Sequence, residues 1–375
     1  MAFALKAARV FDGTAMHQNI AVIIDGTTIA DVLPAANLPN GLCVEDLGGG
    51  ILAPGFIDVQ VNGGGGAMMN DNPTLETVKQ IAAAHRRFGT TGLLPTVITD
   101  DQKIIDQAIA AVQLAIAKNI PGVLGIHLEG PFLDVARKGA HQALFIRAIT
   151  AADVRRISRV ECGTVMLTLA PNKVSPQFIN ELSQHGVLIS LGHAEATVAE
   201  VQQALGAGAR AFTHVYNAMS QLNGREPGMV GVCLVDAESF CGVIVDGLHV
   251  DDFALKILFA AKAKTRIMLV TDAMPPAAGG PESFELQGRM TRRVGNRLQL
   301  VDGTLAGSIV TMDEAVRRTV QLGIKLEDAL RMASAVPAQF MRKDDALGQF
   351  KCGFTASMVH LSDSLYVCKT WIDGK

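Results

Sequence analysis

Four polar residues in this sequence stand at or just past the ends of apolar runs, and all four are of types that serve in metal or catalytic sites. Glu129 ends the run VLGIHLE, His193 follows VLISLG, His214 follows ARAFT and Asp272 follows RIMLVT. Apolar runs of this length are typical of buried strands. Glutamate and histidine are metal ligands, and aspartate can bind a metal or carry a proton. Buried strands that each end in such a residue indicate one sheet whose strand ends meet at one site, as in a barrel enzyme.

One carboxylate and two imidazoles are the three protein ligands that are usual for a catalytic zinc, with a fourth position left for water. A zinc ion held by Glu129, His193 and His214 would lower the pKa of that water to about 7. Asp272 could then take the proton of the water and pass it to a leaving group. A single histidine at a strand end is more often a packing residue, so this prediction depends on all four residues meeting.

Two further histidines belong to the third run or to the loop after it. His127 lies two residues before Glu129, so in a strand both side chains point to the same side, with His127 one layer deeper. We expect His127 to support the site or to pack in the core rather than to bind the metal. His141, in RKGAHQ, would overhang the mouth of a barrel and could polarise a substrate carbonyl, although loop histidines are often merely solvated.

An arginine and a histidine suit the recognition of an anionic group. His249 in DGLHV and Arg225 in NGREPG follow the seventh and sixth runs, and a phosphate would fit such a pair. A surface arginine without a ligand explains Arg225 equally well. After the first run, DVQVNGGGG, Gln60 and Asn62 share a face, and neutral amides bind zinc poorly. The four glycines permit either close approach of the backbone to a ligand or a plain flexible turn.

Between these residues the chain alternates between strand-like and helix-like segments. Amphipathic helical periods occur in TLETVKQIAAAHRRFG, DQKIIDQAIAAVQLAIAKN, ATVAEVQQALGAG and DDFALKILFAAKAK. This alternation predicts a parallel sheet, and eight repeats predict a closed (β/α)8 barrel. An open doubly wound sheet would alternate too, but no GxGxxG motif follows the first strand and polar residues end nearly every strand. The expected buried strands are residues 55–62, 92–99, 123–129, 164–170, 187–193, 210–216, 240–247 and 266–273.

Both ends of the chain differ from the middle. Residues 1–53 and 345–375 are rich in short β-like runs and turns. We therefore expect one small β-sandwich domain made from both termini, and a catalytic barrel of residues 54–344. Between Pro275 and Gly307, proline and glycine turns with an expected hairpin interrupt the alternation of strands and helices. This segment follows the eighth strand, where a lid or pocket wall is expected.

The overall composition excludes several kinds of partner. The 375-residue chain has a net charge of −3 and no basic tract, which argues against nucleic acid. Its six cysteines form no CxxC pair and indicate reduced thiols in a cytoplasmic protein. The start, MAFALKAARVFDG, lacks the apolar core of a secretory signal. No stretch approaches the ~20 apolar residues of a membrane helix, so we expect no membrane partner.

Assembled, these segments resemble the amidohydrolase superfamily and, within it, the N-acetylglucosamine-6-phosphate deacetylases. The match spans almost the whole chain in the order of the family, and HLEGPFLD and THVYNAM are specific motifs, whereas a single LGH is weak. The matching segments are PGFIDVQVNGGGG, HLEGPFLD, KGAHQ, SLGHAEA, THVYNAM, GREPG, DGLHV, VTDAM and GTLAGS.

The resemblance implies a TIM barrel of the metal-dependent type with a small β-sandwich domain. It implies one divalent metal ion on Glu129, His193 and His214, most often zinc, with iron or cobalt as alternatives. Asp272 would be the catalytic acid and base, and His141 would bind the acetyl carbonyl. The family completes its phosphate site across a homodimer interface. The residues implied for substrate binding are Ala140, Asn217, Ala218, Arg225, His249, Leu305, Ala306 and Gly307.

The expected reaction is hydrolysis of the N-acetyl group of N-acetyl-D-glucosamine 6-phosphate, which yields acetate and D-glucosamine 6-phosphate. Many two-metal relatives carry HxH at the end of the first strand, where this chain has Gln60-Val61-Asn62. This departure favours a single tightly held metal and leaves a vestigial second site whose occupancy is open. The alternatives are an amidohydrolase for a different N-acyl sugar or cyclic amide, and an inactive barrel that serves as a scaffold.

Overall fold

Eight parallel strands form the central sheet of the computed structural model, which describes residues 2–375. The strands follow one another around the sheet in sequence order, and each overlaps one of the eight strands predicted above, so the barrel prediction is confirmed. Their bounds are β8 (Phe56–Val61), β11 (Thr90–Ile98), β12 (Gly125–Glu129), β13 (Thr164–Leu169), β14 (Leu188–Leu191), β15 (Ala211–Phe212), β16 (Phe240–Val243) and β17 (Ile267–Leu269).

The first and last strands are joined by side-chain and backbone contacts rather than by a long ladder. Asp58 in β8 accepts hydrogen bonds from the Thr271 hydroxyl at 2.5 Å and the Thr271 backbone N–H at 3.3 Å. At the next residue, the N–H of Asp272 donates to the carbonyl oxygen of Gln60 at 2.9 Å. These contacts hold the segment after β17 against the carboxyl end of β8, and so bring Asp272 beside the residues of the first strand.

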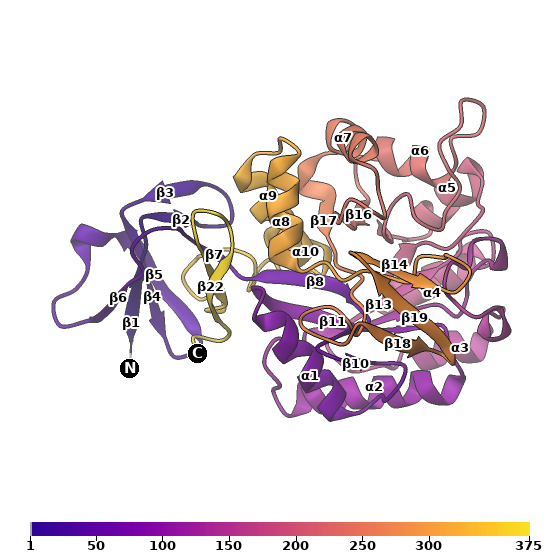
Figure 1. Ribbon diagram of the computed structural model, residues 1–375, viewed down its shortest axis with the longest axis horizontal. Helices are drawn as coiled ribbons and strands as arrows, with labels where there is room; N and C mark the ends of the chain where they lie inside the picture. The colour runs from indigo at the N-terminus through magenta and orange to yellow at the C-terminus, as the bar shows by residue number, and fades with distance from the viewer. Residues whose placement is uncertain (1) are drawn as a thin grey trace.

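Helices cover the outside of the barrel (Figure 1). The four amphipathic stretches predicted from the sequence correspond to α1, α2, α5 and α7. Thr197 and Glu200 form a reciprocal capping box at the start of α5, which satisfies backbone donors that an uncapped helix leaves free. The helix bounds are α1 (Leu75–Arg86), α2 (Gln102–Ala117), α3 (Ala151–Ile157), α4 (Pro176–Gln184), α5 (Val198–Gly206), α6 (Gly228–Val235), α7 (Asp252–Ala261), α8 (Met312–Gln321), α9 (Leu326–Ala333) and α10 (Ala335–Phe340).

No helix among residues 2–375 is long and apolar enough to cross a bilayer. The apolar faces of the helices and the strands of the barrel bury one large continuous hydrophobic cluster, which is the core that a barrel of this kind requires.

The two termini together form a separate small β domain (Figure 1). Strand β21 (Met358–Leu361), from the C-terminal end, lies between β22 (Val367–Trp371) and the N-terminal strand β7 (Ile51–Pro54). This domain has its own apolar cluster, which includes Leu5, Val10 and Trp371. The boundaries at residues 53 and 345 stay predictions. The other strands are β1 (Phe3–Lys6), β2 (Arg9–Phe11), β3 (Met16–Gln18), β4 (Ile20–Asp25), β5 (Thr28–Pro34) and β6 (Cys43–Asp46).

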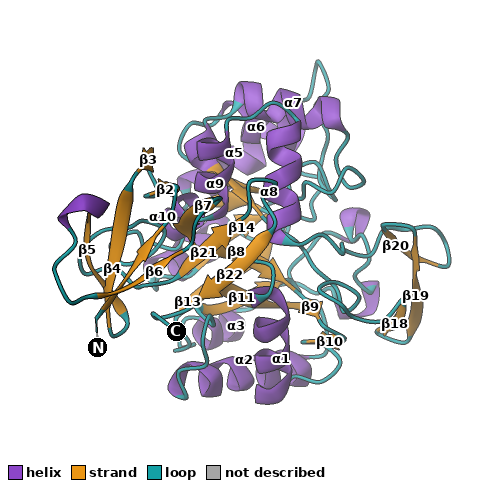
Figure 2. Cartoon of the chain, turned by 60° about the vertical axis from the view of Figure 1, so that its left-hand side comes forward, coloured by secondary structure: helices purple, strands orange, loops and turns teal. Residues whose placement is uncertain are grey.

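The segment after β17 contains a three-stranded antiparallel sheet of β18 (Ser283–Leu286), β19 (Arg289–Val294) and β20 (Arg297–Leu300). The hairpin expected there is confirmed, with one strand more than predicted. This sheet stands at the edge of the molecule (Figure 2), and its apolar side packs with Met274 over the barrel. It also contacts the loop after β12, because Arg289 donates to the carbonyl oxygen of Ala140. A second small pair, β9 (Gly63–Gly64) and β10 (Ala67–Met68), directly follows β8.

Candidate active site

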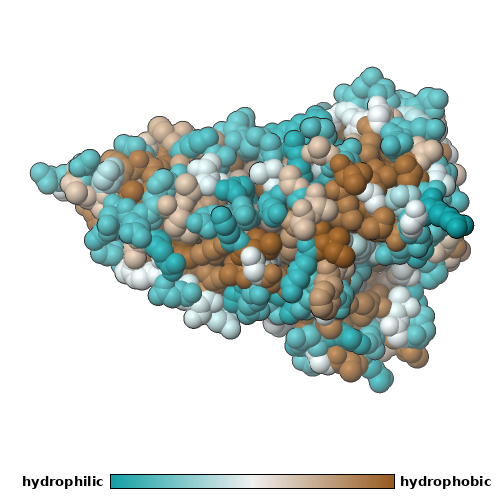
Figure 3. Space-filling view, turned by 90° about the horizontal axis from the view of Figure 1, so that it is seen from above, coloured by the Kyte–Doolittle hydropathy of each residue, from teal (hydrophilic) through white to brown (hydrophobic). Residues whose placement is uncertain are grey.

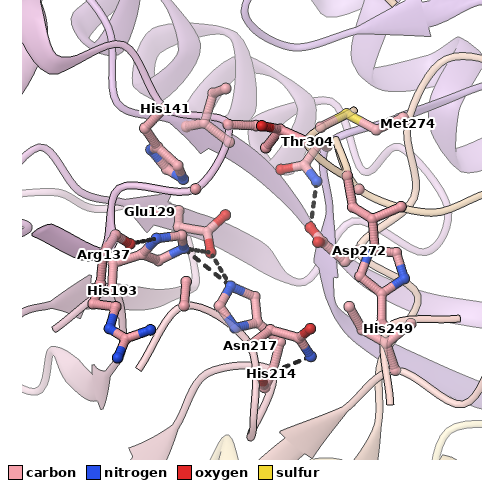
Figure 4. Close-up of a pocket in the computed structure, with 18 of the residues that line it drawn as sticks. Glu129, Arg137, His141, His193, His214, Asn217, His249, Asp272, Met274 and Thr304 are labelled. Atoms are coloured by element: carbon pink, nitrogen blue, oxygen red, sulfur yellow. Dashed lines mark hydrogen bonds and ion pairs between the residues drawn. The ribbon is translucent and has the colours of Figure 1, made fainter. Parts of the chain in front are cut away.

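A cavity of about 420 Å³ opens at the carboxyl ends of the barrel strands, the face where barrel enzymes place their active sites. Figure 4 shows its polar side chains pointing toward one another from different strands. The cavity brings together most residues that the sequence singled out. Those that line it are Asn62, Glu129, Ala140, His141, His193, His214, Asn217, Ala218, His249, Asp272, Leu305 and Gly307.

Glu129, His193 and His214 converge on one point, as predicted. Their ligand-type atoms all lie within 4.8 Å of one another. The Oε1 atom of Glu129 is 3.3 Å from Nε2 of His193 and 3.1 Å from Nε2 of His214, and the two Nε2 atoms are 3.0 Å apart. The dashed lines in Figure 4 mark these contacts. All three residues are buried.

The donor set and its orientation fit a divalent cation. Nδ1 of His193 lies 3.0 Å from the carbonyl oxygen of Arg137, and because a carbonyl only accepts, this nitrogen carries the proton. Nε2 of His193 then presents a lone pair toward Glu129 and His214. A metal-binding histidine normally has its second nitrogen fixed in this way. One carboxylate oxygen and two imidazole nitrogens suit zinc, iron and cobalt alike.

Three of the site residues adopt backbone conformations that side chains rarely take. The φ angles are +49° for His193, +30° for His214 and +50° for Asp272. A positive φ is uncommon for residues other than glycine, and such conformations gather at functional sites. Each of these residues lies where its strand ends and the chain turns away, so the turn aims the side chain across the mouth of the barrel.

The loop after β12 holds His193 from outside the barrel. The short helix at Val135–Arg137 is capped by Asp134, whose backbone N–H donates to the carbonyl oxygen of His193 at 2.9 Å. The Arg137 side chain forms an ion pair with Glu195, two residues beyond His193. Sequence reasoning missed Arg137, because its contact with the His193 ring is through a backbone carbonyl that no residue type reveals.

Burial and neighbouring charges set the protonation states at the site. Burial alone would raise the pKa of Glu129, but the adjacent His193 and His214 imidazoles hold it well below its usual range. Burial, together with the charge of Glu129, raises the pKa of Asp272 to about 6. Burial and the nearby His193 lower the pKa of His141 well below its ordinary value. Glu129 is therefore an anion, and His141 is a neutral imidazole whose N–H can donate a hydrogen bond.

The two amides of the first strand lie beside the carboxylates. Nδ2 of Asn62 is 2.6 Å from Oδ1 of Asp272. Nε2 of Gln60 is 3.2 Å from the same oxygen and 3.0 Å from Oε1 of Glu129. Gln60 lies behind the cavity, whereas Asn62 lines it. Oδ1 of Asn62 is buried and has no hydrogen-bond partner among residues 2–375.

His249 is held by a carboxylate that sequence reasoning missed. Its Nδ1 lies 2.7 Å from Oδ2 of Asp246, and Oδ1 of Asp246 accepts the backbone N–H groups of Leu248 and His249. Nδ1 is thus occupied, which leaves Nε2 as the nitrogen for a ligand. The signal in the sequence was an acid three residues before the histidine, in VDGLH.

Three predicted residues do not line this cavity. Arg225 is exposed in the loop before α6 and does not line the cavity. Within one chain it is therefore not placed to bind a phosphate in this cavity, the role predicted for it. Ala306 is fully buried in the cluster under β18–β20. Gln60 is not part of the cavity lining, but it bonds directly to Glu129 and Asp272. His127 lies one layer deeper, between Thr96 and Thr168, as expected.

The match to known families covers the whole described chain. Residues 51–375 match the model of the amidohydrolase family, and residues 2–52 match that of the NagA composite domain. The chain belongs to the amidohydrolase family. The family match extends over every strand of the barrel and all residues of the candidate site.

Individual amidohydrolases similar to this chain are deacetylases of amino-sugar phosphates. An N-acetylgalactosamine-6-phosphate deacetylase of Shewanella sp. (strain ANA-3) is 43% identical over 87% of this chain and 83% of its own. An N-acetylglucosamine-6-phosphate deacetylase of Haemophilus influenzae is 33% identical over 100% of this chain and 99% of its own. The crystal structure of N-acetylglucosamine-6-phosphate deacetylase from Pasteurella multocida superimposes with a TM-score of 0.97 at 33% identity, over 100% of this chain and 99% of that one.

Proposed function

We propose that this amidohydrolase removes the N-acetyl group of N-acetyl-D-glucosamine 6-phosphate and releases acetate and D-glucosamine 6-phosphate. The observation that carries the proposal is the convergence of Glu129, His193 and His214 at the barrel mouth, with Asp272 in the same cavity. These groups are suited to the hydrolysis of an amide. The similar proteins from Haemophilus influenzae and Pasteurella multocida are named as deacetylases of an amino-sugar phosphate.

The three converging residues would hold one divalent metal ion, and we propose zinc, with Fe²⁺ or Co²⁺ as alternatives. When bound there, such an ion lowers the pKa of water and polarises a carbonyl group. The remaining chemistry belongs to side chains. Glu129 brings the negative charge that offsets the cation, and the Arg137 carbonyl keeps His193 in the tautomer that presents Nε2.

His141 would bind the acetyl carbonyl oxygen. It lies on the loop after β12, its ring centroid is 4.4 Å from that of His193, and its buried Nδ1 has no protein partner among the described residues. Its pKa lies well below the ordinary value because of burial, so the ring is neutral at physiological pH. A neutral imidazole N–H aimed at the carbonyl oxygen stabilises the negative charge that develops there during attack.

Asp272 would move the proton. Its carboxylate accepts a proton as water attacks the acetyl carbon, and the carboxyl group then gives this proton to the amine nitrogen as the C–N bond breaks. Burial and the charge of Glu129 raise the pKa of Asp272 to about 6. A group that titrates near neutral pH can both accept and release a proton, which this two-step role requires.

The sugar phosphate would lie on the side of His249, Asn217 and Ala218, all of which line the cavity. We further propose a homodimer in which Arg225 serves the phosphate site of the other copy. Two observations support this. Arg225 lies outside the cavity of its own chain, and α6 and α7, which follow it in the chain, carry exposed apolar side chains, with Val235 at 82% and Phe253 at 77%. Figure 3, which views the molecule from above, shows hydrophobic residues gathered in patches on this upper side, where α6 and α7 lie in Figure 1.

The 4-epimer, N-acetyl-D-galactosamine 6-phosphate, is a second candidate substrate. It is favoured by the 43% identity to the Shewanella enzyme that is named for it. The six cysteines are free, which suits the cytoplasm that we propose as the location.

The test is release of acetate by metal-replete protein from both epimers and from unphosphorylated N-acetylglucosamine. We expect acetate from N-acetylglucosamine 6-phosphate and a much lower kcat/KM without the phosphate. A kcat/KM that is higher for the galactose epimer would make that sugar the substrate. No acetate from any phosphosugar would refute the proposal.

A further inference from the structure

Two buried amides donate hydrogen bonds to the carboxylates of the site, and one of them, Gln60, bridges both. Gln60 donates one N–H of Nε2 to Glu129 at 3.0 Å and the other to Asp272 at 3.2 Å. Asn62 donates from Nδ2 to Oδ1 of Asp272 at 2.6 Å, the contact marked by the dashed line that ends on Asp272 in Figure 4. Oδ1 of Asp272 thus accepts two amide hydrogen bonds. Both amide side chains are at most 1% exposed.

The orientation of these amides follows from their neighbours. An ionised carboxylate can only accept hydrogen bonds, so the NH₂ end of each amide must face Glu129 or Asp272 rather than its oxygen end. Nitrogen of an amide NH₂ group is not a metal ligand. The end of the first strand therefore presents N–H donors to the two carboxylates.

The amides are themselves fixed by the closure of the barrel. Asp58 accepts the backbone N–H of Gln60 at 3.1 Å and the Thr271 hydroxyl at 2.5 Å. The backbone N–H of Asp272 donates to the carbonyl oxygen of Gln60 at 2.9 Å. These hydrogen bonds hold strand β8 and the turn that carries Asp272 together, so the two amides are fixed relative to the Asp272 carboxylate. A donor held in this way selects one rotamer of its acceptor.

We propose that Asn62, assisted by Gln60, is a positioning residue for Asp272, and that this amide pair replaces the second metal ion instead of marking a remnant of its site. Asn62 keeps the Asp272 carboxylate turned toward the scissile amide, while Gln60 fixes the Glu129 and Asp272 carboxylates relative to each other. The proposal rests on the proposed function, because it assigns Asp272 the transfer of a proton.

A double-mutant cycle tests the coupling. Asn62→Ala is expected to lower kcat about 10- to 100-fold, the usual effect of removing a group that orients a catalytic one, with little change in KM. In an Asp272→Asn background the same substitution should cost almost nothing, because the group that it orients is already inactive. Equal losses of kcat in the two backgrounds would overturn the proposal.

Asn70→Ala is the matched control. Asn70 is also a buried asparagine near the barrel mouth, but it bonds to the Ile98 carbonyl and to Asp100. Any loss of kcat from Asn70→Ala should be the same in both backgrounds, which separates a general loss of packing from the specific coupling.

A crystal structure of the Asn62→Ala variant gives a readout that needs no activity. We expect the Asp272 carboxylate to rotate or to occupy more than one conformer, while Glu129, His193 and His214 keep their places and the metal content is unchanged. A single Asp272 conformer identical to that of the wild type would refute the positioning role. Absence of acetate release by the wild-type protein would refute the proposed function, and the structure of the variant would still decide the role of Asn62.

Discussion

Replacement of Asp272 by asparagine should abolish most of the activity while leaving the site intact. The hydrogen bonds from Asn62 and Gln60 both end on Oδ1 of Asp272. An asparagine at position 272 can keep that oxygen in place and set its NH₂ group where Oδ2 was. The substitution therefore preserves shape and contacts, and it removes only the capacity to accept and return a proton.

The size of the effect follows from that single loss. A positioned general acid and base contributes about 10²- to 10⁴-fold to a rate. At about 1.36 kcal/mol for each factor of ten, Asp272→Asn should raise the activation barrier by about 2.7–5.4 kcal/mol. Because the substrate contacts remain, kcat should carry the loss and KM should change little.

The assay is the initial rate of acetate release at saturating N-acetylglucosamine 6-phosphate, with metal content and Tm recorded on the same preparations. Asp100→Asn is a suitable control, because its carboxylate bonds to Asn70 and Gln287 away from the cavity, and it should keep near wild-type kcat. An Asp272→Asn enzyme with full metal content and a kcat within tenfold of the wild-type value would refute the role given to Asp272.

Three further predictions concern the stability of the fold and the binding of the substrate phosphate. Lys262 is buried, and its Nζ donates to two backbone carbonyl oxygens near the end of α6 at 2.8 Å. Because Lys262→Met leaves those oxygens without a partner, it should lower the free energy of unfolding by about 2–3 kcal/mol, as measured by urea titration. Burial would raise the pKa of Asp153, but the Arg147 guanidinium and the start of α3 hold it below its ordinary value. The ionised Asp153 carboxylate therefore stabilises the fold fully above pH ~4, and this stabilisation is lost as the pH falls through the lowered pKa of the folded state. The wild type should have a higher free energy of unfolding than Asp153→Asn at pH 7, and this difference should be smaller at pH 3. Arg225→Ala should raise KM for the phosphosugar about tenfold or more with kcat preserved, and an unchanged KM would remove Arg225 from the phosphate site.

The strands and the main site residues could be predicted because both leave local signals. Each barrel strand is a short apolar run, and Glu129, His193, His214 and Asp272 follow such runs directly. In a parallel barrel all strand ends of one kind meet at one face, so a correct strand count was enough to bring these four residues together.

Other parts of the site depend on contacts that sequence patterns do not record. Arg137 fixes the tautomer of His193 with a backbone carbonyl, which any residue could supply. The partner of His249 is Asp246, three residues away, and only the turn between them shows that they touch. Arg225 lies outside the cavity of its own chain, so its predicted role depends on a second copy. Gln60 and Asn62 were noticed as missing metal ligands, whereas the structure shows them as hydrogen-bond donors to carboxylates.

We propose that one metal ion on Glu129, His193 and His214 is needed for deacetylation. The direct measurement is titration of metal-stripped protein with Zn²⁺ while acetate release from N-acetylglucosamine 6-phosphate is followed. We expect no activity before addition and a linear rise to a plateau at one equivalent per chain. Full activity in the stripped protein, or a plateau only at two equivalents, would contradict it.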